Sequence, residues 1–273
     1  MVINIFSFKF ATDLADFFKS TFLAILFASV LIGCSKETET KNIIPVDSVD
    51  GIIMPESAAA MKDGRIIVSE IGEFGKAGDG KIVQISIDGS KKVIADSGLN
   101  DPKGLIVKGD TIYVTDNDEV KKVSMTGEVE TWLAAENFPR KPQFLNDITI
   151  GNNVVYVSDS GDLLNGKGGG AIFKVDSNNE VSVLVDETND PTIRSPNGLS
   201  TFQDGFLTFN DFENGFLFRV SLSDLKVEKI GEGYGGADGL VSFGENLYLS
   251  DWKNGKVFKL DVSKDGSEPI LIK

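Results

Sequence analysis

The sequence predicts an all-β protein from three observations: a repeated strand marker, alternating apolar and polar residues around it, and frequent turn residues. The marker is a β-rich run that ends in an acidic residue, and it occurs five times between residues 66 and 251. Its copies read IIVSE, IYVTD, VYVSD, FLTFND and LYLSD. Alternating runs separated by Gly, Asp and Asn are typical of antiparallel strands joined by turns.

The strands around each marker group into a repeating unit. A shorter apolar segment and a polar turn precede the marker, and two further alternating runs follow it, such as GKIVQISIDG and KKVIADSG in the first copy. Four strands in about 40 to 52 residues is the pattern of one propeller blade. We therefore predict a β-propeller of four-stranded antiparallel blades over residues 43–273, with five blades visible. A five-bladed ring, a six-bladed ring with an incomplete blade and a truncated gene all stay open.

The first residues carry the pattern of a lipoprotein leader. Residues 21–33 form a short apolar run preceded by lysines, which suits a signal-peptide core and is too short to span a bilayer as a helix. LIGC at 31–34 resembles the lipobox of bacterial lipoproteins, in which cleavage before the cysteine leaves it to carry lipid. We predict a signal peptide over 1–33, then lipidated Cys34 and a tether over 34–42, and hence a lipid-anchored protein of the bacterial cell envelope, facing the periplasm or the cell surface. An ordinary signal peptide or a membrane anchor with a chance cysteine is the alternative.

Composition excludes several classes of function. The formal charge of −14 makes nucleic acid an improbable partner, because phosphate binding depends on clustered Lys and Arg. The chain has no histidine, which removes Ser-His-Asp systems, histidine general bases and the usual zinc sites. Two stretches begin like a phosphate-binding loop, but Ile82 and Gly168 stand where that loop needs Ser or Thr. We therefore expect no nucleotide partner.

One position of the repeat, just before the first strand of each unit, predicts a site. In chain order it holds Glu56, Lys103, Asn146, Asn197 and Asp238. Because equivalent positions in a propeller lie at equal height around the axis, we expect the four oxygen-bearing side chains to aim at one point near a channel mouth. Two carboxylates and two amides suit a hard divalent cation, calcium most naturally, with zinc, magnesium or manganese as alternatives. Asn-Gly, Asp-Gly and Asn-Asp also form turns, so a purely structural role is the alternative for each position taken singly.

The same segments resemble a known family. PES, FLND, SPNGL and ADGL occur in this order, with one unit between the first two, and are similar to motifs of the family of regucalcin (senescence marker protein), gluconolactonase and luciferin-regenerating enzyme. The resemblance covers about residues 50 to 260 and implies a six-bladed propeller, a divalent metal and hydrolysis of lactones. It implies that the metal ligands are Glu56, Asn146, Asn197 and Asp238. Lactonases of that family often carry Arg two residues before the third-motif Asn to hold substrate, whereas this chain has Phe144 there.

From these observations we expect a membrane-anchored lactone hydrolase that acts on a small lactone or a sugar-derived substrate. The metal would polarise the lactone carbonyl and lower the pKa of a bound water, Asp238 would act as the catalytic base, and Asn146 and Asn197 would also contact the substrate. The alternative is a non-catalytic propeller that uses calcium to rigidify its channel and binds a sugar, a peptide or an envelope protein.

Overall fold

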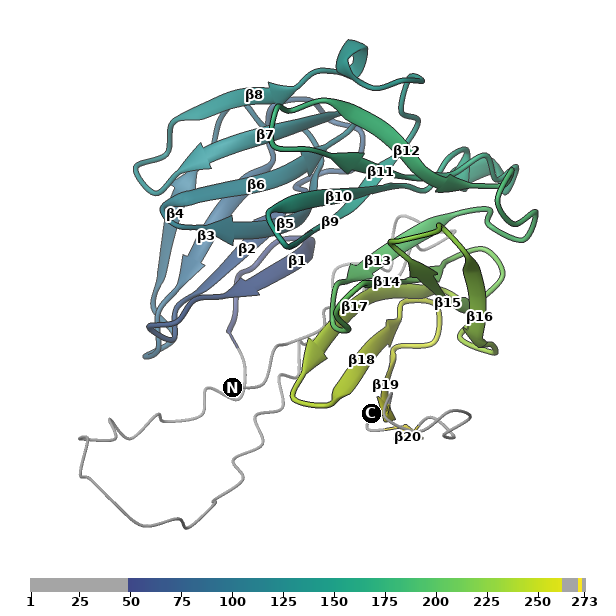
Figure 1. Cartoon of the computed structure of the whole chain (residues 1–273). Helices are drawn as coiled ribbons and strands as arrows, with labels where there is room; N and C mark the ends of the chain where they lie inside the picture. The colour runs from purple at the N-terminus through teal and green to yellow at the C-terminus, as the bar shows by residue number, and fades with distance from the viewer. Residues whose placement is uncertain (1–48, 262–269, 272–273) are drawn as a thin grey trace.

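The regular structure of the described residues is almost entirely β-strand. The computed structural model describes residues 49–261 and 270–271 (Figure 1). Two short 3-10 helices, η2 (Ala135–Asn137) and η3 (Leu163–Asn165), lie in loops between strands. In the part of the chain that the structure describes, no helix is long and apolar enough to cross a membrane. The all-β prediction is confirmed, whereas the predicted signal peptide, Cys34 and the tether lie outside the described residues.

The strands form five sheets of four strands each, and neighbouring strands within a sheet are antiparallel and consecutive in sequence. The blades are β1 (Pro55–Ala60), β2 (Ile66–Glu70), β3 (Lys81–Ile85) and β4 (Lys91–Ala95); β5 (Pro102–Lys108), β6 (Thr111–Asp116), β7 (Glu119–Ser124) and β8 (Val129–Leu133); β9 (Leu145–Gly151), β10 (Val154–Asp159), β11 (Ala171–Val175) and β12 (Val181–Asp186); β13 (Pro196–Ser200), β14 (Phe206–Asp211), β15 (Phe216–Ser221) and β16 (Val227–Gly231); β17 (Ala237–Phe243), β18 (Asn246–Asp251), β19 (Lys256–Asp261) and β20 (Ile270–Leu271). We number these sheets as blades 1 to 5 in chain order.

The first strand of every blade faces the middle of the molecule (Figure 1). These inner strands follow one another in space, since β1 contacts β5, β5 contacts β9, β9 contacts β13 and β13 contacts β17. All five inner strands line one central cavity. The predicted propeller is therefore confirmed, and within residues 49–261 and 270–271 it has five blades and no sixth.

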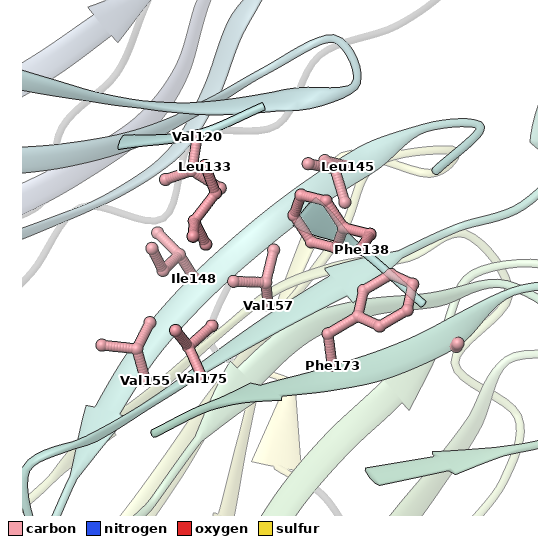
Figure 2. Packing of buried hydrophobic residues seen from close by; sticks show 10 residues of the cluster. Val120, Leu133, Phe138, Leu145, Ile148, Val155, Val157, Phe173 and Val175 are labelled. Atoms are coloured by element: carbon pink, nitrogen blue, oxygen red, sulfur yellow. The ribbon is translucent and has the colours of Figure 1, made fainter. Parts of the chain in front are cut away.

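The core lies between adjacent blades. Figure 2 shows the layer between blades 2 and 3, where Val120 and Leu133 face Ile148 and Val157. The ring of Phe173 is fully buried in this layer and packs edge-on against another phenylalanine, with ring centroids 5.0 Å apart. Burial of each such side chain stabilises the fold by roughly 1.5–3 kcal/mol. The apolar side chains on one face of each strand thus pack against the neighbouring blade and stabilise the contact between blades.

In blades 2, 3 and 4, the acidic residue that ends the sequence marker anchors the loop before the inner strand of its own blade. Asp211 accepts hydrogen bonds from the backbone N–H groups of Arg194 and Ser195 at 2.7 and 2.8 Å. Asp116 and Asp159 hold the corresponding loops of blades 2 and 3 in the same way. The marker therefore fixes the chain at the point where it enters the channel, two or three residues before the predicted site position.

Candidate functional site in the propeller channel

The site position lies in a β-bulge in every blade. Between the first residue of each inner strand and the regular part of that strand, the pairing with the second strand shifts register. In blade 4, Asn197 and Gly198 together stand opposite the single residue Asn210. A bulge bends the strand and changes where its side chains point, which is one reason that bulges occur beside active sites. Here the bulge places the site residue at the channel.

Side chains of the preceding blade support these bulges. Ser69 Oγ of blade 1 donates a hydrogen bond to the backbone carbonyl of Lys103 at 2.7 Å, and Thr115 Oγ1 of blade 2 donates one to the carbonyl of Asn146 at 2.6 Å. The carbonyl of Asp238 accepts the equivalent bond from a side-chain amide of blade 4 at 2.9 Å. Each donor stands directly before the acidic residue of its own marker. In blades 1, 2 and 4, the residue before the marker's acid thus supports the neighbouring blade's site residue.

The structure brings the four predicted metal ligands together. Glu56, Asn146, Asn197 and Asp238 all line one cavity of about 220 Å³ at the middle of the ring. The two asparagines are buried, whereas the two acids keep part of their surface exposed. Lys103, which holds the same repeat position in blade 2, does not line this cavity but a second hollow between the loops of blades 2 and 3. Four of the five repeat positions therefore converge on one space.

Both asparagines have their amide nitrogens tied to the protein. Asn197 Nδ2 donates a hydrogen bond to Asp238 Oδ1 at 2.9 Å, and Asn146 Nδ2 donates one to Ser160 Oγ at 3.2 Å. Neither amide oxygen accepts a hydrogen bond from any residue that the structure describes. Since both residues line the cavity and neither oxygen has a protein donor among the described residues, both oxygens are left available to a ligand.

The carboxyl groups of the two predicted acidic ligands, Glu56 and Asp238, have raised pKa values. Glu56 makes no hydrogen bond or ion pair with the described residues, and its burial raises its pKa well above the ordinary range. Repulsion by Asp238 adds to that rise, while Lys103 opposes it. Burial likewise raises the pKa of Asp238 to about 7, against the lowering effect of the hydrogen bond from Asn197. Two carboxylates that repel each other in a poorly solvated space favour either protons or a cation.

The donor set fits a hard divalent cation. Carboxylate and amide oxygens are the ligands that calcium prefers, and calcium needs six to eight of them. Within residues 49–261, no three Asp, Glu, Cys or His side chains are grouped closely enough to hold a metal. Such a cation would therefore rely on two carboxylates, two amide oxygens and further oxygens from water or substrate.

Asp147 also lines this cavity, and reasoning from the sequence missed it. Its Oδ2 accepts the backbone N–H of Leu199 in blade 4, and its Oδ1 accepts the N–H of Ile148, both at 2.8 Å. Burial raises the pKa of Asp147 to about 7 despite these bonds. Strict strand alternation would place the neighbour of Asn146 on the opposite face. Two adjacent polar residues at the start of an alternating strand were the available signal for a bulge.

Lys103 is the second residue for which the sequence suggested no role. Its side chain is nearly fully buried, with Nζ donating a hydrogen bond to the carbonyl of Asp101 at 3.1 Å. The same Nζ lies 4.6 Å from the centre of the Phe144 ring. Burial lowers the pKa of Lys103, while the charges of Glu56 and Asp101 act in the opposite direction. A cation thus stands beside the four oxygen donors.

Comparison with known proteins supports the fold. No family model matches the chain, and no match is found among curated proteins. A structure of a nidogen/laminin complex is similar with a TM-score of 0.64 and 20% identity, over 79% of this chain and 80% of that one. A catalytically inactive histidine-to-alanine variant of virginiamycin B lyase from Staphylococcus aureus with quinupristin has a TM-score of 0.59 and 16% identity, over 85% of this chain and 74% of that one. At these identities the likeness shows a β-propeller fold, and the regucalcin resemblance stays a prediction.

Proposed function

We propose that the central cavity binds a hard divalent cation, calcium fitting best, and hydrolyses a lactone or a related carboxylic ester. The observation that carries this proposal is the convergence of Glu56, Asn146, Asn197 and Asp238 from four blades on one cavity. The tied amide nitrogens support it, because they leave two oxygens for a cation. Two neighbouring carboxylates with raised pKa values and no ion pair to any described residue support it as well.

The residues of the cavity would have two roles, which are binding the cation and accepting a proton. When bound, a divalent cation supplies Lewis acidity toward the carbonyl oxygen of the substrate and toward an attacking water. Glu56, Asp238 and the two amide oxygens would hold it. Asp238 Oδ1 already accepts the amide of Asn197, so Oδ2 is the oxygen free to take the proton of the attacking water. Asp147 suits this task less well, since both of its oxygens accept backbone N–H groups.

The chemistry must differ from that of one structural neighbour. The virginiamycin B lyase variant is inactive when one histidine is replaced by alanine. This chain has no histidine at all, so an equivalent residue is absent. Carboxylates, amides and hydroxyls are therefore the side-chain groups from which a catalytic step at this cavity has to be built, with a bound metal.

The leader sequence supports a location at the membrane surface. We propose that Cys34 carries lipid and holds the propeller in the bacterial cell envelope through the polar tether over 34–42. The substrate would then be a small lactone or a sugar-derived molecule present on that side of the membrane.

A non-catalytic role is the second candidate, and the small number of charged donors favours it. Only two carboxylates belong to the predicted ligand set, which is enough to hold calcium as a rigid cross-link between blades. One neighbour is a propeller solved in a complex of two proteins, nidogen and laminin. In this reading the calcium-loaded channel stabilises a surface that binds a sugar, a peptide or an envelope protein.

One experiment separates the two functions. Purified protein is given a panel of γ- and δ-lactones and simple esters, with calcium, with zinc and after removal of metal by dialysis. We expect turnover that depends on metal and falls by on the order of 100-fold or more in Asp238→Asn. Asp251→Asn is the matched control, because Asp251 is buried in the same blade and does not line the cavity. Calcium binding without any turnover would establish the non-catalytic alternative.

A further inference from the structure

Lys103 is a buried cation without a close negative partner among the described residues. Its side chain is only 2% exposed, yet it forms no ion pair within 4 Å in that part of the chain. Its one hydrogen bond goes to the neutral carbonyl of Asp101, and the face of Phe144 covers another side of the ammonium. An ammonium has three N–H donors, so two of them have no acceptor in the described structure.

The unused donors have space in front of them. Lys103 and Phe144 line a hollow formed by the loop after β6 and the loop before β9, together with Asn117, Gln143 and Lys141. Amide and ammonium groups thus dominate this wall of the hollow. The carboxylate of Asp118 also lines it, but that carboxylate lies 3.6 Å from Lys141 Nζ. A ligand in the hollow would therefore meet hydrogen-bond donors and an aromatic ring.

The positive charge of Lys103 is compensated least when the channel holds a divalent cation. Glu56 is the strongest negative influence on Lys103, although the two do not form an ion pair. If Glu56 holds a divalent cation, its charge is shared with that cation, and Lys103 loses part of this compensation. Burying a charge without compensation is costly, and a ligand of opposite charge removes that cost.

We propose that Lys103 is an anion-binding residue that recognises a carboxylate in this hollow. A single carboxylate fits better than a phosphate dianion, because Asp101 and Asp116 lie nearby and the chain carries a net charge of −14. For the hydrolase, the consequence is that a lactone extending from the channel into the hollow is preferred when it bears a carboxylate there. That preference depends on the proposed function, whereas carboxylate binding itself does not.

The first test measures binding without turnover. Gluconate and glucitol differ only in a carboxylate that replaces a hydroxymethyl group, and neither is a lactone. Calorimetry is done on metal-free protein prepared by dialysis and on calcium-loaded protein. We expect gluconate to bind at least about 10-fold more tightly than glucitol in both states, and Lys103→Met to remove most of that difference. Lys108→Met, which removes an exposed lysine of the same strand that lines neither cavity, should change gluconate affinity less than about twofold.

Stability separates recognition from a structural role. Since Lys103→Met replaces an unpaired buried charge by an apolar side chain of similar length, its melting temperature should equal or exceed that of the wild type. A drop of several degrees together with unchanged gluconate affinity would overturn the proposal. If Lys103→Met does not fold, Lys103→Gln is measured in the same way, and it should lose the same preference.

A kinetic test then connects the inference to catalysis. Glucaro-γ-lactone and glucono-γ-lactone differ in one carboxylate, and the wild type should show the higher kcat/KM for the first. Lys103→Met should lose that preference while retaining turnover of glucono-γ-lactone. Gluconate binding that needs Lys103 in a protein that hydrolyses no lactone would uphold this inference and refute the hydrolase. Equal binding of gluconate and glucitol, or equal binding of gluconate by the wild type and Lys103→Met, would refute the inference whatever the activity.

Discussion

Asp238→Asn should change how stability depends on pH in the metal-free protein. Burial raises the pKa of Asp238 from an ordinary 3.8 to about 7 in the folded state. The folded state therefore binds this proton more tightly than the unfolded state does. The stabilisation is complete below about pH 4 and is lost as the pH rises through about 7. Metal-free wild type should accordingly become less stable across this window.

The size of the effect follows from the shift. About three pKa units at about 1.4 kcal/mol each give an upper limit of about 4 kcal/mol. Because Asp238 keeps some contact with the cavity, we expect about half of that, roughly 2 kcal/mol. For a domain of this size this corresponds to about 4–8 °C in melting temperature. Asp238→Asn cannot ionise, so at pH 8 the metal-free variant should melt about that much higher than the wild type, and near pH 5 the advantage should disappear.

The assay is thermal unfolding followed by circular dichroism at several pH values between 5 and 8. Calcium should raise the melting temperature of the wild type with the logarithm of its concentration above the dissociation constant, and raise that of Asp238→Asn much less. Asp251→Asn weakens acceptor bonds to Asn254 and should lower stability by a similar amount at every pH. Parallel pH profiles of melting temperature for the wild type and Asp238→Asn would show that the pKa of Asp238 is not raised in the folded protein. The electrostatic argument for a cation at this site would then fail.

Four further outcomes are expected. Calcium affinity should fall by about 10-fold per pH unit below pH 7, because protons compete for Asp238, and calorimetry at pH 6 and pH 8 checks this. Cys34→Ser should move the protein from the membrane fraction to a soluble or unprocessed form, and wild type without lipid mass on its N-terminus would contradict the anchor. Phe173→Ala should lower the free energy of unfolding by about 3–5 kcal/mol in urea while leaving calcium affinity unchanged, since its fully buried ring lies between blades. Thr115→Val should weaken calcium binding several-fold with a stability loss of about 1 kcal/mol, because it removes the bond to the carbonyl of Asn146, and an unchanged calcium affinity would dismiss that support.

The repeating pattern was enough to predict the strands and which repeat positions border the central cavity. Each marker run became the second strand of a blade, and the residue chosen by register in each blade stands at the channel or beside it. This worked because alternation and turns are local properties of the chain. The four oxygen-bearing residues reach one cavity because repeat symmetry, rather than any single motif, sets their position.

What the sequence could not predict depends on contacts between blades. Asp147 enters the cavity only because a bulge adds one residue to the inner strand, and alternation alone assigns it to the other face. Lys103 could be placed in the repeat, but its burial against Phe144 and its lack of an ion pair arise from packing of a loop from the next blade. The side chains of Ser69 and Thr115, each next to the acid of its marker, support the adjacent blade through contacts that the strand pattern alone does not predict.

These hydroxyl supports bear on how such a ring diversifies. A duplicated blade carries a residue for the channel and also the donor that holds the backbone of the next blade's channel residue. Ser69 holds the carbonyl of Lys103 as Thr115 holds that of Asn146, although one side chain is a cation and the other an amide. The hydrogen bond that holds the backbone at the site position is therefore independent of which side chain stands there. A single substitution at one site position can thus change the charge near the channel while the backbone around that position keeps its conformation.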